Sequence, residues 1–565
     1  MTFNEFKYER PDFDQYKKEI SSLVNQIESS NQPSAQIESI KQVWAKQSDL
    51  ATQAELAAIR YSINTEDKFY EKESEYWDEF GPLYQEIELD FKKALVKSKF
   101  RKDLEKEFGT HYFNLLENGL KVFSPDVIEE CQEENKLITE YNKLMASAKI
   151  EYNGTTYNLA GLGPFKISTD RSVRKESSEL ANDFFATNKN KFEDIFDKLV
   201  KLRDKKAKKL GFENYIEFGY VNMNRTDYDQ NMVANFRKQI LEYLVPTATK
   251  LYQRQKERLG LSELYYYDEK FEFNSGNAKP HGDAHFIVQN AQKMYNELSP
   301  ETKEFFEFMV NSQLLDLETA PAKQPGGYCT YINNYKAPFI FSNFNGTAGD
   351  VDVLTHEVGH AFQVYQSRYI EIPDLMFPTC ESCEIHSMSM EFITFPWMNL
   401  FFKEEADKYK FIHMSDALKF IPYGIIVDEF QHLIYANPNA SAQERNTFFR
   451  ELEKKYLPHR IYADAPLLED GCFWFRQGHI FQLPFYYIDY TLAQICALQF
   501  WKKMNHDRTS AWQDYLNICK IGGLKSFLGI VQLGQLLSPF DNGCVENIIG
   551  EIDNYLSSIN DKEFN

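Results

Sequence analysis

One stretch of the sequence indicates both a helix and a chemical site: Val353-Leu-Thr-His356-Glu357-Val-Gly-His360-Ala-Phe362. Its two histidines are four residues apart, and in an α-helix this spacing stacks both imidazoles on one face, about one turn apart. Two imidazoles placed in this way suit a tetrahedral metal ion. Glu357 lies beside them and can reach a water on the metal rather than the metal itself. The stretch therefore predicts a helix with two metal ligands and a general base. The alternative is a helix with two satisfied histidines and a surface glutamate.

Two ligands do not hold a catalytic zinc ion, so a third must come from another part of the chain. The elongated zinc-protease motif H-E-x-x-H-x-x-G-x-x-H is excluded, because Gln363 and Gln366 occupy its glycine and third-histidine positions. We therefore expect a carboxylate on the next helix. After the prolines of residues 373–378, residues 379–395 can form that helix, and Pro396 ends it. Spacing alone does not choose among its acids, which are Glu381, Glu384 and Glu391.

A short β region is expected directly before the metal helix. Residues 328–332 and 338–344 are two strand-like runs that flank the turn-like pair Asn333-Asn334, which predicts an antiparallel pair. We expect an exposed edge at residues 339–343, where an extended peptide backbone can pair with the strand. The alternative is an ordinary hairpin packed on the helix. Another short hairpin is expected at residues 150–157.

Helical periodicity dominates the rest of the chain. Apolar residues recur at steps of three and four from Phe13 to Ile27, directly after Pro11. Similar patterns run over residues 113–148, 171–210, 230–259 and 285–316. The sequence therefore predicts a mainly α-helical protein.

Composition and charge exclude several classes of function. The chain has 63 basic and 84 acidic side chains, and a formal net charge of −21 disfavours nucleic acid as a partner. No uninterrupted apolar run approaches the roughly 18 residues of a membrane span. The N-terminus lacks the basic and then apolar layout of a secretory signal. Eight scattered cysteines fit thiols in a reducing compartment, and Cys380 and Cys383 are expected to be ordinary helix residues. We expect a soluble cytoplasmic protein without a membrane partner.

The metal motif extends into a family resemblance. His356-Glu-Val-Gly-His360 followed by Glu384-Ile-His-Ser387-Met-Ser-Met-Glu391 resembles the thimet oligopeptidase and oligoendopeptidase F family of zinc peptidases, and is closer to the oligoendopeptidase F (Pz-peptidase) branch. The similarity covers most of the chain from about residue 165 onward, including residues 203–215. His386 stands where the thimet branch has proline. The resemblance implies Glu384 as the third ligand of one zinc ion per chain. Glu381 and Glu391 are candidate acceptors for the ligand imidazoles, or plain helix-surface residues.

A later segment is the candidate for stabilising the reaction intermediate. Residues 478–490 contain His479, and Pro484 suits the first turn of a helix that would put Tyr487 and Tyr490 on one face. Such a stripe of tyrosines is ordinarily part of a hydrophobic core. The resemblance implies instead that His479 and a tyrosine pair contact the substrate and the intermediate. The thimet branch has one more residue between its histidine and its tyrosines, so Tyr486 remains an alternative to Tyr487.

The resemblance also implies the architecture and the activity. We expect a bilobed helical metallopeptidase with a small β-sheet beside the zinc helix and a deep substrate channel. Residues 1–165 are expected to form an N-terminal helical region and residues 166–565 the catalytic region, with zinc helices at about 350–396 and the tyrosine segment at about 478–501. The expected activity is cleavage of internal bonds in short oligopeptides, with Glu357 as general base. The alternatives are a zinc carboxypeptidase or dipeptidyl carboxypeptidase of related architecture, and a catalytically inactive peptide-binding protein. The oligomeric state is not readable from the sequence.

Overall fold

The computed structural model describes residues 1–564, which form two compact units, each assembled from three separate segments of the chain. Unit 1 contains residues 1–120, 279–404 and 496–536. Unit 2 contains residues 121–278 and 405–495 and the chain from Leu537 onward. The units are therefore interleaved along the sequence. The division into an N-terminal region and a catalytic region at residue 165 stays a prediction.

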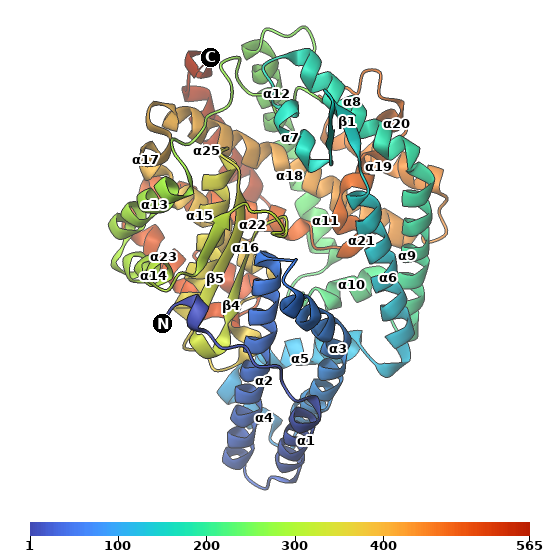
Figure 1. The fold of residues 1–565 in the computed structure, drawn as a ribbon, viewed down its shortest axis with the longest axis vertical. Coiled ribbons are helices and arrows are strands. Elements are labelled where there is room, and N and C mark those ends of the chain that lie inside the picture. Colours follow the sequence, from blue (N-terminus) through green and yellow to red (C-terminus); the bar gives the residue numbers. More distant parts are fainter. Residues whose placement is uncertain (565) are drawn as a thin grey trace. The chain divides into compact units, whose positions relative to one another are not determined.

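Unit 1 consists of helices and one three-stranded sheet (Figure 1). Its N-terminal segment contains α1 (Phe13–Ser29), α2 (Pro33–Ile63), α3 (Lys68–Val96), α4 (Arg101–Phe108) and most of α5 (Thr110–Val122). Its middle segment contains α13 (Ala284–Leu298), α14 (Pro300–Asn311), β3 (Leu315–Glu318), β4 (Tyr328–Ile332), β5 (Ala337–Phe344), α15 (Gly349–Ser367), α16 (Cys380–Ile393) and α17 (Asn399–Phe402). The last segment contains the end of α22 (Ile488–His506), α23 (Arg508–Ile521) and α24 (Phe527–Leu533).

Unit 2 is also mainly helical. Its first segment contains α6 (Ile128–Ala146), the hairpin of β1 (Ile150–Tyr152) and β2 (Thr155–Tyr157), α7 (Gly163–Lys166), α8 (Arg171–Thr187), α9 (Lys189–Lys209), α10 (Tyr215–Asn222), α11 (Gln230–Gln239) and α12 (Val245–Arg258). The others contain α18 (Ala406–Ala436), α19 (Ala442–Tyr456), α20 (Pro466–Glu469), α21 (Gly478–Gln482), the start of α22 and α25 (Cys544–Ser558). The mainly helical fold with small sheets is confirmed, and the deep substrate channel stays a prediction.

Helix α1 illustrates how the apolar pattern becomes structure. The Asp12 side chain accepts a hydrogen bond from the Gln15 amide and so caps the helix start. Tyr16, Ile20, Leu23 and Ile27, all members of the predicted stripe, are buried in the core of unit 1. The stripe at steps of three and four is thus the buried face of this helix, as predicted.

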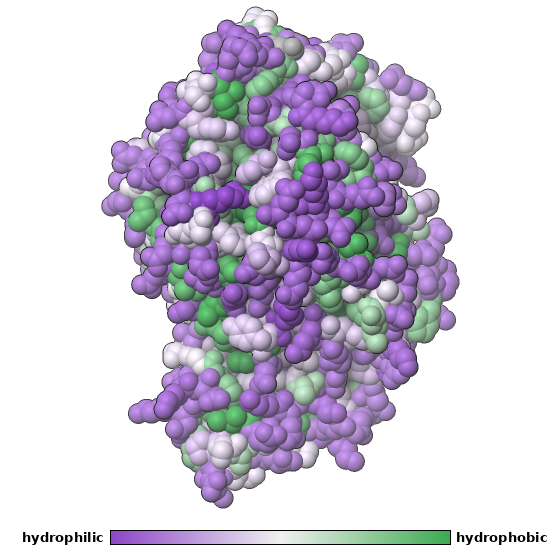
Figure 2. Space-filling model, turned by 90° about the vertical axis from the view of Figure 1, so that its left-hand side faces the viewer, coloured by the Kyte–Doolittle hydropathy of each residue, from purple (hydrophilic) through white to green (hydrophobic). Residues whose placement is uncertain are grey.

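No helix among residues 1–564 is both long enough and apolar enough to cross a membrane. Hydrophilic side chains predominate on the face of the molecule drawn in Figure 2.

The sheet of unit 1 corrects one prediction. The strands are arranged in the order β3-β5-β4, with β5 parallel to β3 and antiparallel to β4. Ile340 of β5, for example, pairs with Leu315 on one side and with Cys329 on the other. The antiparallel pair is confirmed, but the expected exposed edge at residues 339–343 is wrong. Because β5 is the central strand, both of its edges already have hydrogen-bonding partners.

Helices α15 and α16 cross at very short range. A Cβ atom on Gly359 of α15 would lie 2.6 Å from the Cα of Ser387 and 2.7 Å from the carbonyl oxygen of His386, both on α16. Real Cβ atoms do not approach backbone atoms so closely, so only glycine allows this crossing. α16 begins at Cys380 and ends at Ile393, close to the predicted helix. The α15–α16 contact therefore sets the spacing of the two helices that carry the metal-ligand candidates.

We expect Gly359→Ala to destabilise the protein, although alanine is intrinsically the better helix former. The added methyl group meets backbone rather than a movable side chain, and overpacking of this kind costs about 1–3 kcal/mol. The matched control is Gly550→Ala in α25, where a Cβ meets nothing within 4 Å. That control should be neutral or stabilising by up to about 1 kcal/mol. Thermal and urea unfolding of both variants measure the difference, and equal stability for the two would contradict the tight crossing.

Candidate metal centre

Three side chains of unit 1 converge on one point. His356 and His360 from α15 and Glu384 from α16 each offer one ligand atom, and these atoms lie within 4.8 Å of one another. The Nε2 atoms of His356 and His360 are 3.2 Å and 3.6 Å from the same oxygen of Glu384, Oε2. The two imidazole rings are 5.0 Å apart, as the spacing of four residues requires. Among the described residues, the group that could hold a metal contains Glu384 and neither Glu381 nor Glu391.

Two further side chains hold the converging groups in place. Glu391 accepts a hydrogen bond from Nδ1 of His356 at 2.7 Å, which leaves Nε2 directed at the convergence point. The Ser387 hydroxyl donates to Oε2 of Glu384 at 2.9 Å. The role expected for Glu391 as an imidazole acceptor therefore has a geometric basis. The sequence did not single out Ser387 for this contact. Its position three residues after Glu384, one helical turn away, is the signal that predicts it.

The charges of the group follow from burial and from neighbours. Burial lowers the pKa of His360 to about 4, so this imidazole is neutral. Burial opposes the charge of Glu384, but His360, His356 and Ser387 outweigh it and lower the pKa of this carboxyl to about 2. Burial also opposes a proton on His356, yet the bonds to Glu384 and Glu391 prevail and raise its pKa well above the usual value. The two carboxylates thus favour a proton on His356 in the metal-free site.

Glu357 lies beside this group but outside it. The residue is 8% exposed, and its Oε2 atom is buried without a hydrogen-bond partner. Burial raises the pKa of this carboxyl to about 7, with Glu384 and Glu391 adding to the increase and His356 opposing it. A buried carboxyl oxygen without a partner is unusual, because leaving it unpaired costs free energy. Such an atom is available to a water or to a substrate.

The donor set fits zinc. Two imidazoles and one carboxylate are a known ligand combination of catalytic zinc sites, which keep the fourth position open. With bond lengths of about 2.0–2.1 Å, neighbouring ligand atoms of a tetrahedral zinc ion are about 3.3 Å apart. The separations of 3.2 Å and 3.6 Å between the imidazole nitrogens and Glu384 are close to this value. The residues present therefore fit a zinc ion.

The other predicted site residues form a cluster in unit 2. The ring of His479 is 4.9 Å from the ring of Tyr487 and 6.0 Å from that of Tyr490, and it stacks on Tyr486 at 5.7 Å. All four side chains are partly exposed, which distinguishes them from ordinary core residues. The structure thus brings His479, Tyr487 and Tyr490 together, and Tyr486 lies with them. The metal-ligand candidates and this cluster belong to different units.

The helix predicted to begin at Pro484 begins four residues later. α22 starts at Ile488, so Tyr487 precedes the helix and Tyr490 is in its first turn. The reason is Phe485, whose φ of 68° is in the left-handed region and interrupts any helix there. The predicted shared helix face for Tyr487 and Tyr490 is therefore wrong, although their rings are 5.6 Å apart.

His479 is held as a neutral hydrogen-bond donor. The Tyr423 hydroxyl donates to Oε1 of Gln477, which directs the Gln477 amide nitrogen at Nδ1 of His479, 2.8 Å away. Nδ1 accepts this bond, so the remaining proton of a neutral imidazole is on Nε2. Burial lowers the pKa of His479, which favours the same neutral form.

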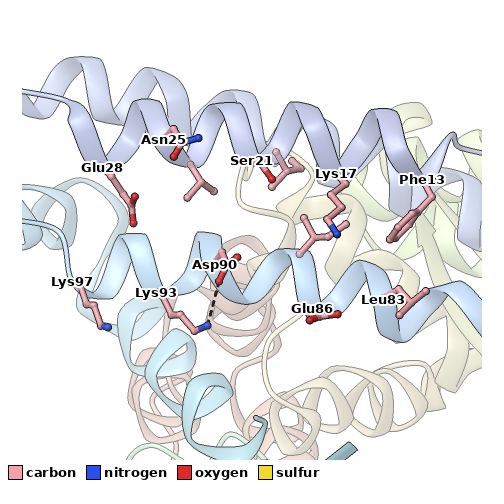
Figure 3. A pocket seen from close by; sticks show the side chains of 13 residues that line it. Phe13, Lys17, Ser21, Asn25, Glu28, Leu83, Glu86, Asp90, Lys93 and Lys97 are labelled. Carbon is pink, nitrogen blue, oxygen red and sulfur yellow. Dashed lines mark hydrogen bonds and ion pairs between the residues drawn. The ribbon is translucent and has the colours of Figure 1, made fainter. Parts of the chain in front are cut away.

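A separate pocket of unit 1 contains none of these residues. It has a volume of about 490 Å³, lies between α1 and α3, and is lined by apolar side chains together with charges of both signs (Figure 3). One pair of these charges, Lys93 and Asp90, is bonded at 3.2 Å. Because its charges already offset one another in this way, the pocket offers no ligand set comparable to that of the metal centre.

Comparisons with known proteins agree with the geometry. Residues 3–123 match the Peptidase M3 N-terminal domain, and residues 165–546 match Peptidase family M3. An oligoendopeptidase F homolog from Borreliella burgdorferi is 23% identical over 428 residues, which are 70% of this chain and 69% of that protein.

Solved structures are similar over nearly the whole chain. PZ peptidase A, solved with an inhibitor, is 51% identical with a TM-score of 0.94, covering 99% of this chain and 100% of that one. Oligoendopeptidase F from Enterococcus faecium is 15% identical with a TM-score of 0.61 over 98% and 99% of the two chains, and this likeness concerns the fold alone. Since the family match spans more than half of the chain, the protein belongs to peptidase family M3 and is a metalloendopeptidase.

Proposed function

We propose that this family M3 peptidase is a zinc-dependent endopeptidase that cleaves internal bonds of short oligopeptides. Its ligands are His356, His360 and Glu384, which hold one zinc ion per chain. The observation that carries the proposal is the convergence of three ligand atoms within 4.8 Å of one another beside a buried, unpaired oxygen of Glu357. The names of two relatives, an oligoendopeptidase F homolog and PZ peptidase A, support peptides as the substrate class.

Each residue of the centre has a distinct task in this proposal. Zinc supplies a Lewis acid that polarises a peptide carbonyl and acidifies a bound water. Glu357 accepts a proton from the attacking water and returns it to the leaving amine. Burial raises the pKa of Glu357 in the metal-free site, and a raised pKa favours the uptake of a proton by this carboxylate. Glu391 orients His356, and Ser387 orients Glu384.

The cluster of unit 2 supplies hydrogen-bond donors to the reacting carbonyl in this proposal. Neutral His479 presents the Nε2 proton, and Tyr487 and Tyr490 present hydroxyl groups. Donors placed in advance stabilise the negative charge that develops on the carbonyl oxygen during attack. The sheet edge for the substrate backbone is β4, since it is an outer strand and its residues Tyr328, Cys329 and Thr330 are partly exposed.

The experiment that tests the function uses an oligopeptide blocked at both ends. Internal cleavage of this peptide, read by mass spectrometry, is the expected result, because an endopeptidase needs no free terminus. A carboxypeptidase would leave the blocked peptide intact and shorten the same peptide with a free carboxyl end. A protein that only binds peptides would cleave neither.

We expect Glu384→Ala to lose both zinc and turnover, because two imidazoles alone do not retain the ion. Glu381→Ala, on the same helix and equally buried, is the matched control and should keep one zinc ion per chain. Elemental analysis after dialysis measures the metal content. If Glu384→Ala kept its zinc and Glu381→Ala lost it, the third ligand would be Glu381 and not Glu384.

We expect Glu357→Gln to keep its zinc and its substrate affinity while turnover falls by about 10²- to 10⁴-fold. Glutamine has the size and helix propensity of glutamate but cannot accept the proton. Glu391→Gln is the comparison, since it weakens the support of His356 and should reduce zinc affinity by about 10- to 100-fold. Excess zinc should therefore restore the Glu391 variant and not the Glu357 variant. Near-normal turnover in Glu357→Gln would exclude the proposed base.

The restriction to short peptides has its own test. A reduced and denatured protein of a hundred residues or more presents extended backbone, but a long stretch of chain continues on both sides of nearly every peptide bond. We expect the enzyme to cleave pre-cut fragments of this protein and to leave the uncut chain largely intact over the same time. Mass spectrometry follows both digests. Efficient internal cleavage of the uncut chain would identify a general protease rather than an oligopeptidase.

A further inference from the structure

Residues 478–490, which we call the His/Tyr segment, are held in unit 2 largely by side chains. The segment contains the short helix α21, a turn over residues 483–487 and the first residues of α22, so the carbonyl groups at the end of α21 and in the turn are not all bonded within a helix. Buried backbone carbonyls need donors from elsewhere, because an unpaired one costs free energy. Two arginines elsewhere in unit 2, one on α9 and one in the loop after α10, have fully buried side chains and provide those donors.

Arg203 of α9 holds the first part of the segment. Its side chain is 0% exposed, and its guanidinium donates to the carbonyl oxygens of Phe481 and, at 3.5 Å, Ile480. Both residues are in α21, the helix that contains His479. Nε of Arg203 donates to Glu134 at 2.7 Å, so a buried carboxylate balances the charge. The position of the His479 backbone is thereby tied to α9 and α6.

Arg225 holds the second part. Its side chain and that of Asp489 are both 0% exposed, and Nη2 of Arg225 donates to Asp489 at 2.9 Å and also to the carbonyl oxygen of Phe485. The guanidinium lies over the ring of Tyr220 at 4.4 Å. Asp489 lies directly before Tyr490, and Phe485 lies two residues before Tyr487. One nitrogen atom of Arg225 therefore ties both ends of the stretch that carries the tyrosines.

The turn between these contacts has a conformation that the local sequence does not favour. Phe485 has a φ of 68°, which is sterically costly for a residue with a large side chain. Its amide donates to Oε1 of Gln431 at 2.9 Å. Its ring packs so closely against Gly219 that a Cβ atom on this glycine would lie 2.5 Å from a ring carbon. A strained backbone persists only where surrounding groups impose it. Here Gln431, Gly219 and Arg225 impose it together.

We propose that Arg203 and Arg225 are positioning residues that set the location of the His479 imidazole and of the Tyr487 and Tyr490 hydroxyls. This inference rests on the proposed role of those groups as donors. A donor that stabilises a transition state must be held within a fraction of an ångström, and buried guanidinium groups paired with carboxylates hold the segment more firmly than its own turn would. The arginines themselves do not touch the substrate in this proposal.

The alternative is that both arginines only stabilise unit 2, and a third buried arginine offers the matched control. Arg174 of α8 is 2% exposed, pairs with the fully buried Asp268 at 2.9 Å, and donates to the carbonyl oxygen of Ser168 at 2.7 Å. Its hydrogen bonds and ion pair are with residues outside the His/Tyr segment. Burial and pairing are thus similar, although Asp268 also pairs with Arg171 at 2.6 Å, and the contact with the segment is the difference that the experiment tests.

The experiment compares Arg225→Met, Arg225→Lys and Arg174→Met in the zinc-loaded enzyme. We expect both methionine variants to lower the unfolding temperature by similar amounts and to keep one zinc ion per chain. Only Arg225→Met should lower kcat, by about 10²-fold, with little change in KM, because displacement of the order of 1 Å has an effect of this size. Arg225→Lys should recover part of the turnover, since one ammonium group can replace the single nitrogen that makes both contacts. Arg203→Met is expected to behave as Arg225→Met does.

A second arm places Arg225→Met in a Tyr487→Phe/Tyr490→Phe background. If Arg225 acts through the hydroxyls, its loss should reduce kcat little further there, because residues that act as a unit are not additive. The inference would be overturned if Arg225→Met reduced kcat by the same factor in both backgrounds. It would also be overturned if Arg225→Met and Arg174→Met had equal kcat values. Full turnover in the tyrosine variants alone would instead refute the proposed donor role. If Arg225→Met does not fold, Gly219→Ala, which displaces the Phe485 ring, should give the same selective loss of kcat.

Discussion

The close crossing of α15 and α16 is the contact on which the metal centre depends. Gly359 lies between the two histidines of α15, and its missing side chain lets the backbone of α16 approach at Ser387. His356 and His360 lie on either side of this contact along α15, and Glu384 lies one turn before it along α16. Zinc tolerates errors of only about 0.2 Å in its ligand distances. A wider helix spacing would separate the carboxylate from both imidazoles, and the remaining residues of the site could not compensate.

Two buried glutamates at this crossing have opposite properties. Glu384 and Glu357 are both nearly inaccessible to water, which by itself raises the pKa of a carboxyl group. Glu384 faces two imidazoles and a hydroxyl, and they hold it ionised with a pKa of about 2. Glu357 has an oxygen without a hydrogen-bond partner, and its pKa is raised to about 7. The partners, rather than the residue type or the degree of burial, therefore distinguish the proposed ligand from the proposed base.

Two sequence predictions failed where distant segments determine local structure. The edge expected at residues 339–343 is absent because β3, a strand of only four residues, occupies it. Such a short strand has too little pattern to be recognised from its own residues. The helix expected from Pro484 is interrupted at Phe485, whose conformation is imposed by Gln431 on α18, Gly219 on α10 and Arg225. None of these residues is near Phe485 in sequence, so a local pattern could not reveal them.

The sequence by itself determined the helices with a strong apolar stripe, the strand pair before the metal helix, and the two imidazoles with Glu357 beside them. These features depend on periodicities of two and of three to four residues, which a linear pattern contains. Through a family resemblance it also indicated Glu384. Only the tertiary structure decided the position of β5 inside its sheet, the contact of Glu391 with His356, the orientation of His479 through Gln477, and the way buried arginines hold the His/Tyr segment. Each of these depends on residues tens to hundreds of positions apart, and for Gln477 the distant residue is Tyr423. A buried polar group pairs with the partner that the fold brings within hydrogen-bonding distance.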